Sequence, residues 1–192
     1  MTIRITIDDL IKLQACQEGI EAFRSEFGQV AELTWDRETQ VSLVKSPLRR
    51  WISWAAMKRL IPKLSLTGAD LCRADLTEAD LTGADLREAN LRWAVLYRAD
   101  VTQADLYRAD LTGANLSWAN LSRSDLTGAN LRQANLHGTN LSLSHLIRAN
   151  LREAGMTEVD LFRADLTGAD LAEADLAEAF MPDGSYLQKG KP

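Results

Sequence analysis

The sequence is poor in the residues that mark disulfide-bonded, membrane-spanning or metal-binding proteins. Its 192 residues include two cysteines, two histidines and four prolines, and aromatic residues make up 6% of the chain. Cys16 and Cys72 are too few for a disulfide framework or a thiolate cluster, so we expect a reducing, cytoplasmic location. No apolar run approaches the about eighteen residues of a membrane span, and the N-terminus lacks the apolar core of a signal peptide.

The scarcity of histidine also argues against an enzyme. His137 and His145 fall on different faces of the repeat described below, and neither has a cysteine or serine partner at a recognisable spacing. The glycines form no phosphate-binding loop. We therefore expect no catalytic residue, no cofactor and no metal site.

A column of carboxylates is the one alternative to that expectation. Residues spaced twenty apart project from one face, and such a column could bind a hard cation such as calcium. Its members are Asp85, Asp105, Asp125, His145 and Asp165. The simpler interpretation is that such short carboxylates satisfy nearby backbone N–H groups.

Charge is distributed unevenly along the chain, whose net charge is −5. Residues 1–64 carry a net +2, residues 65–181 a net −8, and residues 182–192 a net +1. All basic residues of the central part are arginines. This asymmetry predicts an N-terminal helical or mixed cap over 1–64, a repeat domain over 65–181 and a C-terminal tail over 182–192.

The central part is a repeat with a period of five residues. Leucine recurs at every fifth position from Leu66 to Leu176, with Val101 and Met156 as substitutes, and Met181 ends the series. A small residue stands two positions before each leucine, and Asp or Asn nearly always lies between them. The small residue is alanine in most units; the exceptions are Ser124, Thr139, Ser144 and Val159.

A period of five fits neither the 3.6-residue helix nor the two-residue strand. The leucines share one axis only if the backbone turns after each unit, so that four units close a square coil of twenty residues. Stacked coils then form a parallel β-solenoid of about six coils, in which each coil is stabilised by its neighbours. The small residues share the interior with the leucines.

The run A-(D/N)-L-x-x resembles the pentapeptide-repeat family over 65–181. The resemblance implies a right-handed quadrilateral parallel β-helix whose leucine and preceding small residue point inward. The fold is therefore expected to be mainly β. The open N-terminal end of such a rod exposes apolar surface and unpaired backbone, so we expect residues 1–64 to form an α-helical or mixed capping region.

The head should contain helices and short strands. Thr6 is a suitable N-cap for an apolar helical stripe that ends at Gly28. We expect two short strands, over 30–35 and 41–44, around a polar turn at 36–38. A second helix begins at Ser46-Pro47 and runs to about residue 61.

That second helix is basic and amphipathic. Its basic and aromatic residues are Arg49, Arg50, Trp51, Trp54, Lys58 and Arg59. Such a helix packs as a lid on the first coil, which is the favoured interpretation, or binds an anionic membrane, nucleic acid or an acidic partner. In the second case the rod is a spacer for the head.

Two groups of outward-facing residues are candidate partner-binding surfaces. Adding twenty residues places Arg98 beneath Trp118, which predicts a cation–π pair. The first group, typical of an interaction hot spot, is Val95, Tyr97, Arg98, Trp118 and His137. The second group replaces polar residues with apolar ones and consists of Leu143, Ile147 and Phe162.

The C-terminal end of the repeat offers a further contact. Phe180 and Met181 replace the usual polar residue and leucine before Pro182. Some family members dimerise through an apolar final coil, so these two residues are candidates for a homodimer contact. The tail folding over them is the alternative, and it is slightly favoured.

The sequence therefore predicts a protein-interaction scaffold that presents acidic, arginine and aromatic ladders to a protein partner. The alternative is DNA mimicry, since acidic members of the quinolone-resistance type engage DNA gyrase. The arginines dispersed among the acids, the unbroken register and the added head argue against mimicry.

Overall fold

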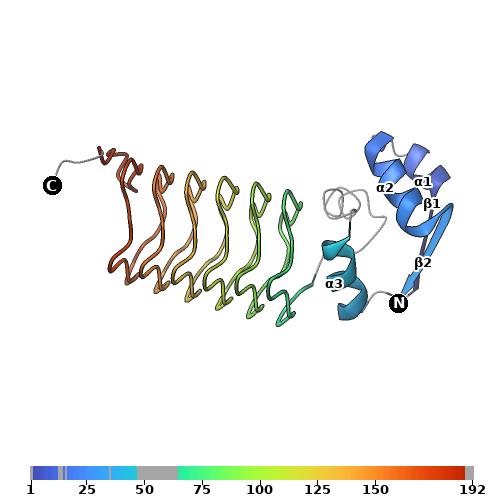
Figure 1. The fold of residues 1–192 in the computed structure, drawn as a ribbon, viewed down its shortest axis with the longest axis horizontal. Helices are drawn as coiled ribbons and strands as arrows, with labels where there is room; N and C mark the ends of the chain where they lie inside the picture. The colour runs from blue at the N-terminus through green and yellow to red at the C-terminus, as the bar shows by residue number, and fades with distance from the viewer. Residues whose placement is uncertain (1, 13–14, 16, 35, 47–64, 189–192) are drawn as a thin grey trace.

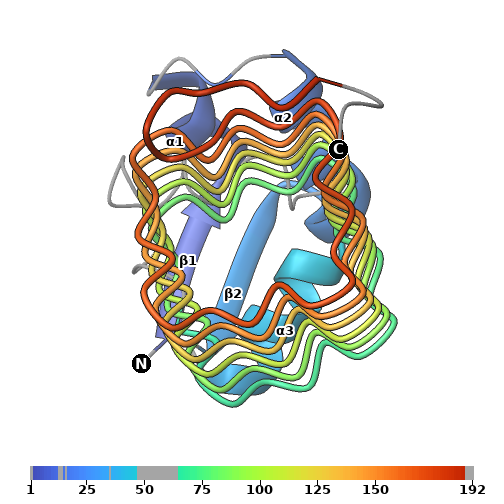
Figure 2. The same cartoon turned by 90° about the vertical axis from the view of Figure 1, so that its left-hand side faces the viewer.

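The protein consists of a mixed α/β head and a long four-sided rod. The computed structural model describes residues 2–12, 15, 17–34, 36–46 and 65–188. The coils stack in one direction with the head at their N-terminal end (Figure 1), and the rod seen along its axis is a square (Figure 2). Within these residues, no helix is long and apolar enough to cross a membrane.

The head has a two-stranded sheet and three helices. The order is β1 (Thr2–Thr6), α1 (Ile7–Lys12), α2 (Gln17–Phe27), β2 (Val30–Thr34) and α3 (Arg37–Lys45). Strands β1 and β2 pair antiparallel. Ile3 and Ile5 of β1 are buried in the core of the head beside Phe23 of α2.

Local signals explain where these helices begin and end. The Thr6 hydroxyl accepts a hydrogen bond from the Asp9 N–H (3.1 Å), and the Asp9 carboxylate accepts one from the Thr6 N–H (2.8 Å), so the predicted cap is confirmed. Gly28 ends α2 with φ +73, and its N–H donates to the Arg24 carbonyl. The expected single helical stripe is divided into α1 and α2.

The prediction of a strand over 41–44 is wrong, because these residues lie in α3. The segment at 36–38 begins that helix instead of forming a turn between strands. The Asp36 carboxylate accepts a hydrogen bond from the Thr39 N–H at 2.8 Å and caps the helix. Gln40, Leu43 and Val44 are buried, and their positions i, i+3 and i+4 lie on one face of a helix. Strand β1 was not expected, although the alternation of Thr2–Thr6 signals it.

Helix α3 lies beside the first coil (Figure 1) and is tied to it by a hydrogen bond. The Gln40 side-chain oxygen accepts from the Ser65 N–H at 2.7 Å, and Gln40 is itself buried. The first backbone donor of the rod is therefore satisfied by the head.

The rod is built from β-bridges between residues twenty apart, such as Asp70 with Asn90. Leucines from Leu66 to Leu161 are fully or almost fully buried, with the small residues beside them. Polar replacements inside the rod are satisfied locally: the Ser124 hydroxyl donates to the Leu121 carbonyl at 2.6 Å, and Thr139 to Leu116 at 2.8 Å. The expected quadrilateral β-helix is confirmed.

In the inner coils, main-chain carbonyls accept four of the five backbone N–H groups of each repeat. The leucine and the second residue after it donate to the following coil, as Leu71 does to Asn90 at 2.8 Å. The small residue donates to the leucine carbonyl of the unit just before it, as Ala74 does to Leu71 at 3.0 Å. The Asp or Asn donates to the preceding coil, as Asn90 does to Ala69 at 2.9 Å.

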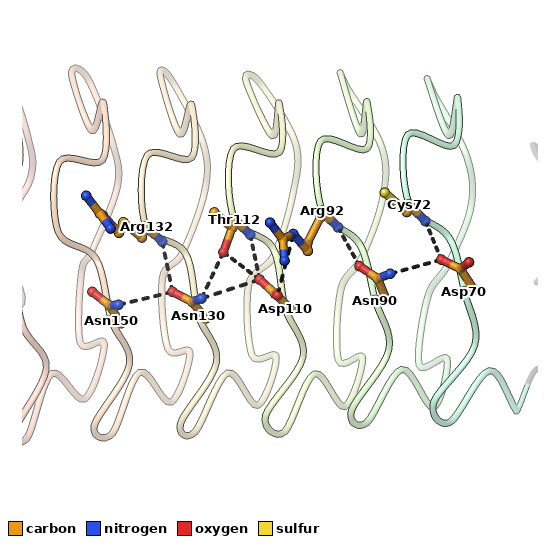
Figure 3. A network of polar contacts seen from close by, with 9 residues as sticks. All are labelled: Asp70, Cys72, Asn90, Arg92, Asp110, Thr112, Asn130, Arg132 and Asn150. Carbon is orange, nitrogen blue, oxygen red and sulfur yellow. Dashed lines mark hydrogen bonds and ion pairs between the residues drawn. The ribbon is translucent and has the colours of Figure 1, made fainter.

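The Asp or Asn side chain accepts the fifth N–H. Asp70 Oδ1 accepts from the Cys72 N–H at 3.1 Å, and the same contact recurs along the rod up to Asp175 and the Ala177 N–H. This Asx turn accounts for the polar residue in the motif. Figure 3 shows the column from Asp70 to Asn150, in which the Asn side-chain amides also donate to the preceding coil, as Asn90 does to Asp70 Oδ1 at 3.0 Å.

The residue that closes each turn has a positive φ. We call it the corner residue; it is the second residue after each leucine, and it lies between two faces of the rod. Many non-glycine residues adopt this conformation, including Arg98 (φ 54) and Leu143 (φ 60). The left-handed region costs an L-residue about 1–2 kcal/mol, which the stacking of coils must offset.

The tail covers one side of the last coil. Phe180 pairs antiparallel with Tyr186, their ring centroids lie 4.9 Å apart, and the Leu187 N–H donates to the Ala179 carbonyl at 2.9 Å. Met181 packs partly buried against the core. Leu166, Leu171 and Leu176 are likewise only partly buried on the end of the rod.

The Asx turn can be tested by removing it at one position. Asn130 Oδ1 accepts from the Arg132 N–H (3.3 Å), and its amide donates to the Thr112 hydroxyl (2.8 Å). We expect Asn130→Ala to lower the free energy of unfolding by about 1 kcal/mol, measured by chemical denaturation. An unchanged free energy would contradict the role assigned to the side chain.

The reciprocal test adds a missing Asx turn. Gly155 occupies an Asp/Asn position, and a Cβ there would meet nothing within 4 Å. We expect Gly155→Asn to stabilise the rod by about 1–2 kcal/mol, from a restricted unfolded chain and a new acceptor for the Thr157 N–H. Gly155→Ala is the matched control, because it restricts the chain without adding an acceptor, and it should stabilise less.

Candidate interaction face

The rod has four faces, which we number by the columns that start at Ser65 (face 1), Asp70 (face 2), Asp75 (face 3) and Asp80 (face 4). Face 3 differs from the others because it carries no formal charge over four successive coils, whereas the uncharged stretch of face 4 spans only two. On face 3, Val95 and Gly155 replace the usual Asp or Asn. The outward residues of this uncharged stretch are Val95, Tyr97, Asn115, Ser117, Asn135, His137, Gly155 and Thr157.

Two exposed tryptophans stand at the corners that border face 3. Trp93 lies at the corner with face 2 and Trp118 at the corner with face 4, and each has 49% of its surface exposed. Both are corner residues with positive φ, 58 and 59. The two rings therefore flank the uncharged stretch in successive coils.

Each tryptophan ring rests on a glycine of the next coil. A Cβ on Gly113 would lie 2.3 Å from Trp93 Cζ3, and a Cβ on Gly138 would lie 2.6 Å from Trp118 Cε3. Only a residue without a side chain leaves room for these rings. The glycine fixes one side of the ring and leaves the other side open to a partner.

Two arginines on another corner also lie over glycines, but they do not require them. Cβ atoms on Gly128 and Gly168 would lie 3.5 Å from the Cγ atoms of Arg108 and Arg148, which is an ordinary contact distance. In the described rod, every corner glycine after the first coil follows a tryptophan or arginine one coil earlier. Only at Gly113 and Gly138 does the glycine provide space for its neighbour as well as freedom in φ.

His137 links Trp118 to the face itself. The two rings meet edge to face with centroids 5.0 Å apart, and His137 Nδ1 lies 2.7 Å from the Thr157 hydroxyl. The His137 N–H donates to Asn135 Oδ1 at 3.1 Å. Ser117, beneath the tryptophan, is buried. Trp118 is therefore held from two sides before any partner arrives.

The predicted cation–π pair between Arg98 and Trp118 is wrong. The Arg98 guanidinium lies over the neighbouring Tyr97 ring, 5.2 Å from its centroid, while Trp118 leans toward the C-terminal end of the rod onto Gly138. Corner side chains point toward the following coil. The Trp118 ring therefore lies away from Arg98, and the two side chains do not stack. Val95, Tyr97, Arg98, Trp118 and His137 nevertheless all lie on or beside face 3.

Arginines have two different environments in the rod. Those directly after a leucine pair with acids, as Arg87 does with Asp85 at 2.6 Å and Arg132 with Glu153 at 2.7 Å. Three of the six corner arginines instead lie over the aromatic ring that precedes them, as Arg108 does over Tyr107 at 5.0 Å. The paired arginines interrupt the negative charge of faces 1 and 2.

The pair of Arg87 and Asp85 is the clearest electrostatic perturbation. The side-chain hydrogen bond from Arg87 lowers the pKa of Asp85 from its ordinary 3.8 to about 2. Because the pKa is lowered on folding, this contribution to stability is present above pH 3.8. It is lost as the pH falls through about 2.

The second candidate group lies around the corner between faces 4 and 1. Leu143 and Phe162 are exposed and Ile147 is half-buried. The Leu143 N–H donates to the Phe162 carbonyl at 2.9 Å, so these two residues occupy neighbouring coils. Arg163 covers part of this group, with its guanidinium 5.1 Å from the centroid of the Phe162 ring.

The remaining candidates lie at the ends of the rod or in the carboxylate column. Phe180 and Met181 contact the tail, as described above. The basic helix over Arg49, Arg50, Trp51, Trp54, Lys58 and Arg59 lies outside the described residues. In the proposed cation column, Asp125 Oδ1 accepts from the Thr127 N–H at 2.9 Å and Asp165 from Thr167 at 2.9 Å, so these oxygens serve Asx turns.

Trp93 was missed by reasoning from sequence. It stands alone in its column, since Arg73 precedes it and Gly113 follows it. The signal that identifies it is the glycine twenty residues later, the same signal that follows Trp118. Only the structure shows that this glycine is needed by the ring.

Comparison with known proteins identifies the family. The pattern of the family described as pentapeptide repeats matches residues 64–92, 89–128, 124–161 and 156–182. The chain belongs to the pentapeptide-repeat family. Among curated proteins, none matches the chain.

Several solved structures are similar to this chain. AT2G44920 from the Arabidopsis thaliana thylakoid lumen is 32% identical, and the match covers 47% of this chain and 63% of that one, with a TM-score of 0.47. HetL from Nostoc sp. strain PCC 7120, involved in heterocyst differentiation regulation, is 37% identical over 64% of this chain and 70% of its own (TM-score 0.33). QnrB1, a plasmid-mediated fluoroquinolone resistance protein, is 17% identical over 66% and 81% (TM-score 0.39). This chain thus corresponds to less than two thirds of the Arabidopsis protein.

The seat of Trp93 can be tested with two glycine substitutions. Gly113→Ala and Gly68→Ala both place alanine at a positive φ, +66 and +61, and each should lower the free energy of unfolding by about 1–2 kcal/mol. Only Gly113 has a ring against it, so only Gly113→Ala should shift the indole N–H resonance of Trp93 in an NMR spectrum. Equal spectra for the two variants would contradict the seat.

The ion pair on face 1 gives a pH-dependent prediction. Arg87→Ala removes the hydrogen bond that lowers the pKa of Asp85, so this pKa should rise from about 2 toward 3.8, measured by NMR titration of the carboxyl carbon. Arg73→Ala is a control at an arginine on a different face. A pKa of Asp85 that stays near 2 without Arg87 would refute the pair.

Proposed function

We propose that this protein is a non-enzymatic scaffold that binds a protein partner through face 3. The observation that carries the proposal is the pair of exposed tryptophans, Trp93 and Trp118, seated on glycines at both edges of an uncharged stretch. Tryptophan, tyrosine and arginine are the residues most enriched at interaction hot spots, and all three occur here.

The rigidity of the rod supports this function. Trp93 and Trp118 are one coil and one five-residue unit apart, which is about 6 Å along the axis. Their backbone N–H groups are bonded to the following coil, and their rings are held before binding. A partner therefore meets a fixed arrangement of aromatic groups and loses little free energy to ordering them.

A second candidate function is DNA mimicry directed at DNA gyrase. The net charge of −8 over residues 65–181 favours it. Arginines paired with acids on faces 1 and 2, and the uncharged middle of face 3, oppose it because a mimic of DNA needs a continuous negative field. We favour the protein scaffold, placed in the cytoplasm, where the exposed free thiol of Cys72 is stable.

The proposal is tested by capture of partners from the lysate of the native host. We expect Trp93→Ala/Trp118→Ala to lose the captured protein by at least about tenfold, since hot-spot tryptophans each contribute roughly 2 kcal/mol or more. Binding is measured by quantitative mass spectrometry against the unmodified protein.

The matched control is Arg108→Ala/Arg148→Ala, which truncates the two corner side chains that lie over Gly128 and Gly168 on another corner. This variant should retain the partner. Retention by the tryptophan variant would remove face 3 from consideration. Capture of gyrase subunits by all three proteins, together with inhibition of supercoiling, would favour DNA mimicry.

A further inference from the structure

We propose that the partner of face 3 is an extended basic segment of another protein, which lies along the rod. An apolar or aromatic residue of this segment contacts Trp93 and Trp118, and its lysines or arginines reach the carboxylates of the last two coils. This inference rests on the proposed function and adds the chemistry and direction of the bound segment.

The charge along face 3 changes from one end to the other. The two corners that border the face carry two arginines, two tryptophans and one glutamate, Glu78, in the N-terminal half, and four glutamates with no basic residue in the C-terminal half. Along the corner with face 2 the residues are Arg73, Trp93, Gly113, Gln133, Glu153 and Glu173. Along the corner with face 4 they are Glu78, Arg98, Trp118, Gly138, Glu158 and Glu178.

The acidic end is only partly neutralised by the rod. Glu153 pairs with Arg132 at 2.7 Å, and Glu173 lies 3.7 Å from Arg152, both across the corner with face 2. On the other side of the face, within the described part of the chain, no ion pair is made by Glu158, Asp175 or Glu178. Glu158 and Asp175 are exposed, and Glu178 is half-buried. These three carboxylates are the complement of a basic segment.

The surface between the tryptophans and these carboxylates is formed mainly by small residues. It passes over Gly138, where the ring of Trp118 lies, and Gly155, whose missing Cβ would meet nothing within 4 Å. Thr157 and Asn135 offer a hydroxyl and an amide beside this path. These small residues leave room for an extended backbone, and the long side chain beside this path, His137, is half-buried and held by Thr157.

The spacing of the rod sets the spacing of the motif. Glu158 is two coils beyond Trp118 and Glu178 is three coils beyond it. At about 4.8 Å per coil these separations are about 10 and 14 Å, and an extended peptide advances about 3.3 Å per residue. A lysine or arginine should therefore follow or precede the apolar anchor by about three to four residues.

The test is selection of random twelve-residue peptides displayed on phage, using the intact protein as the target. We expect enrichment of peptides with an aromatic residue or proline about three to four positions from a lysine or arginine. Selected peptides, made synthetically, should bind at least about tenfold more weakly to Trp93→Ala/Trp118→Ala and to Glu158→Lys/Glu178→Lys, measured by fluorescence anisotropy. Affinity should also fall as salt is raised.

Glu88→Lys is the matched control for Glu158→Lys, because both are exposed corner glutamates with φ 57, on different corners. The control should bind the peptides as the unmodified protein does. Peptides that depend on the tryptophans but are indifferent to Glu158→Lys would overturn this inference and leave the proposed function standing. Peptides that ignore both would overturn both.

A second copy of this chain is the competing occupant. Its residues 45–63 are themselves basic and contain Trp51 and Trp54. Displacement of the selected peptides by a synthetic peptide of 45–63, together with a dimeric mass in light scattering, would assign face 3 to self-association. That result would overturn the proposal of a different protein.

Discussion

The rod depends on acceptors for its backbone N–H groups. Carbonyls of the same or neighbouring coils supply four acceptors for an inner repeat, and the side chain of Asp or Asn supplies the fifth except where Val95 and Gly155 replace it. A buried or half-buried N–H without an acceptor costs about 1–3 kcal/mol, so the loss would accumulate over many repeats. In the last unit Phe180 stands at the Asp or Asn position and supplies no side-chain acceptor. None is needed there, because the residue two positions later is Pro182, which has no N–H.

Much of this fold follows from the sequence because the same five-residue pattern recurs along the whole rod. Leucine every five residues, a small residue before it and a short polar residue between them leave the square coil as the only backbone that buries every leucine. In the head, each signal for a helix or strand occurs only once. Asp36 before Arg37 was therefore interpreted as a turn, although its carboxylate caps α3, and the five alternating residues of β1 were too short to stand out.

The candidate face was only partly accessible from the sequence. Adding twenty residues places Tyr97, Trp118 and His137 on one side of the rod, but it does not show which way a corner side chain leans. The prediction for Arg98 failed for that reason, since its guanidinium turns to Tyr97. Trp93 was overlooked because what distinguishes it is the contact of its ring with Gly113. Aligning the repeats by twenty residues does not show this contact.

Bridges between residues twenty apart make the core and the surface respond differently to changes in length. Insertion of one five-residue unit keeps every leucine inside, so the rod should still fold. The same insertion turns everything downstream by a quarter of the circumference, and one placed between Trp93 and Trp118 would move the two rings to different sides of the molecule. Duplication of a whole coil leaves the faces aligned and only lengthens them. Lineages of such proteins can thus remodel their surfaces by gaining or losing short units while the interior stays intact.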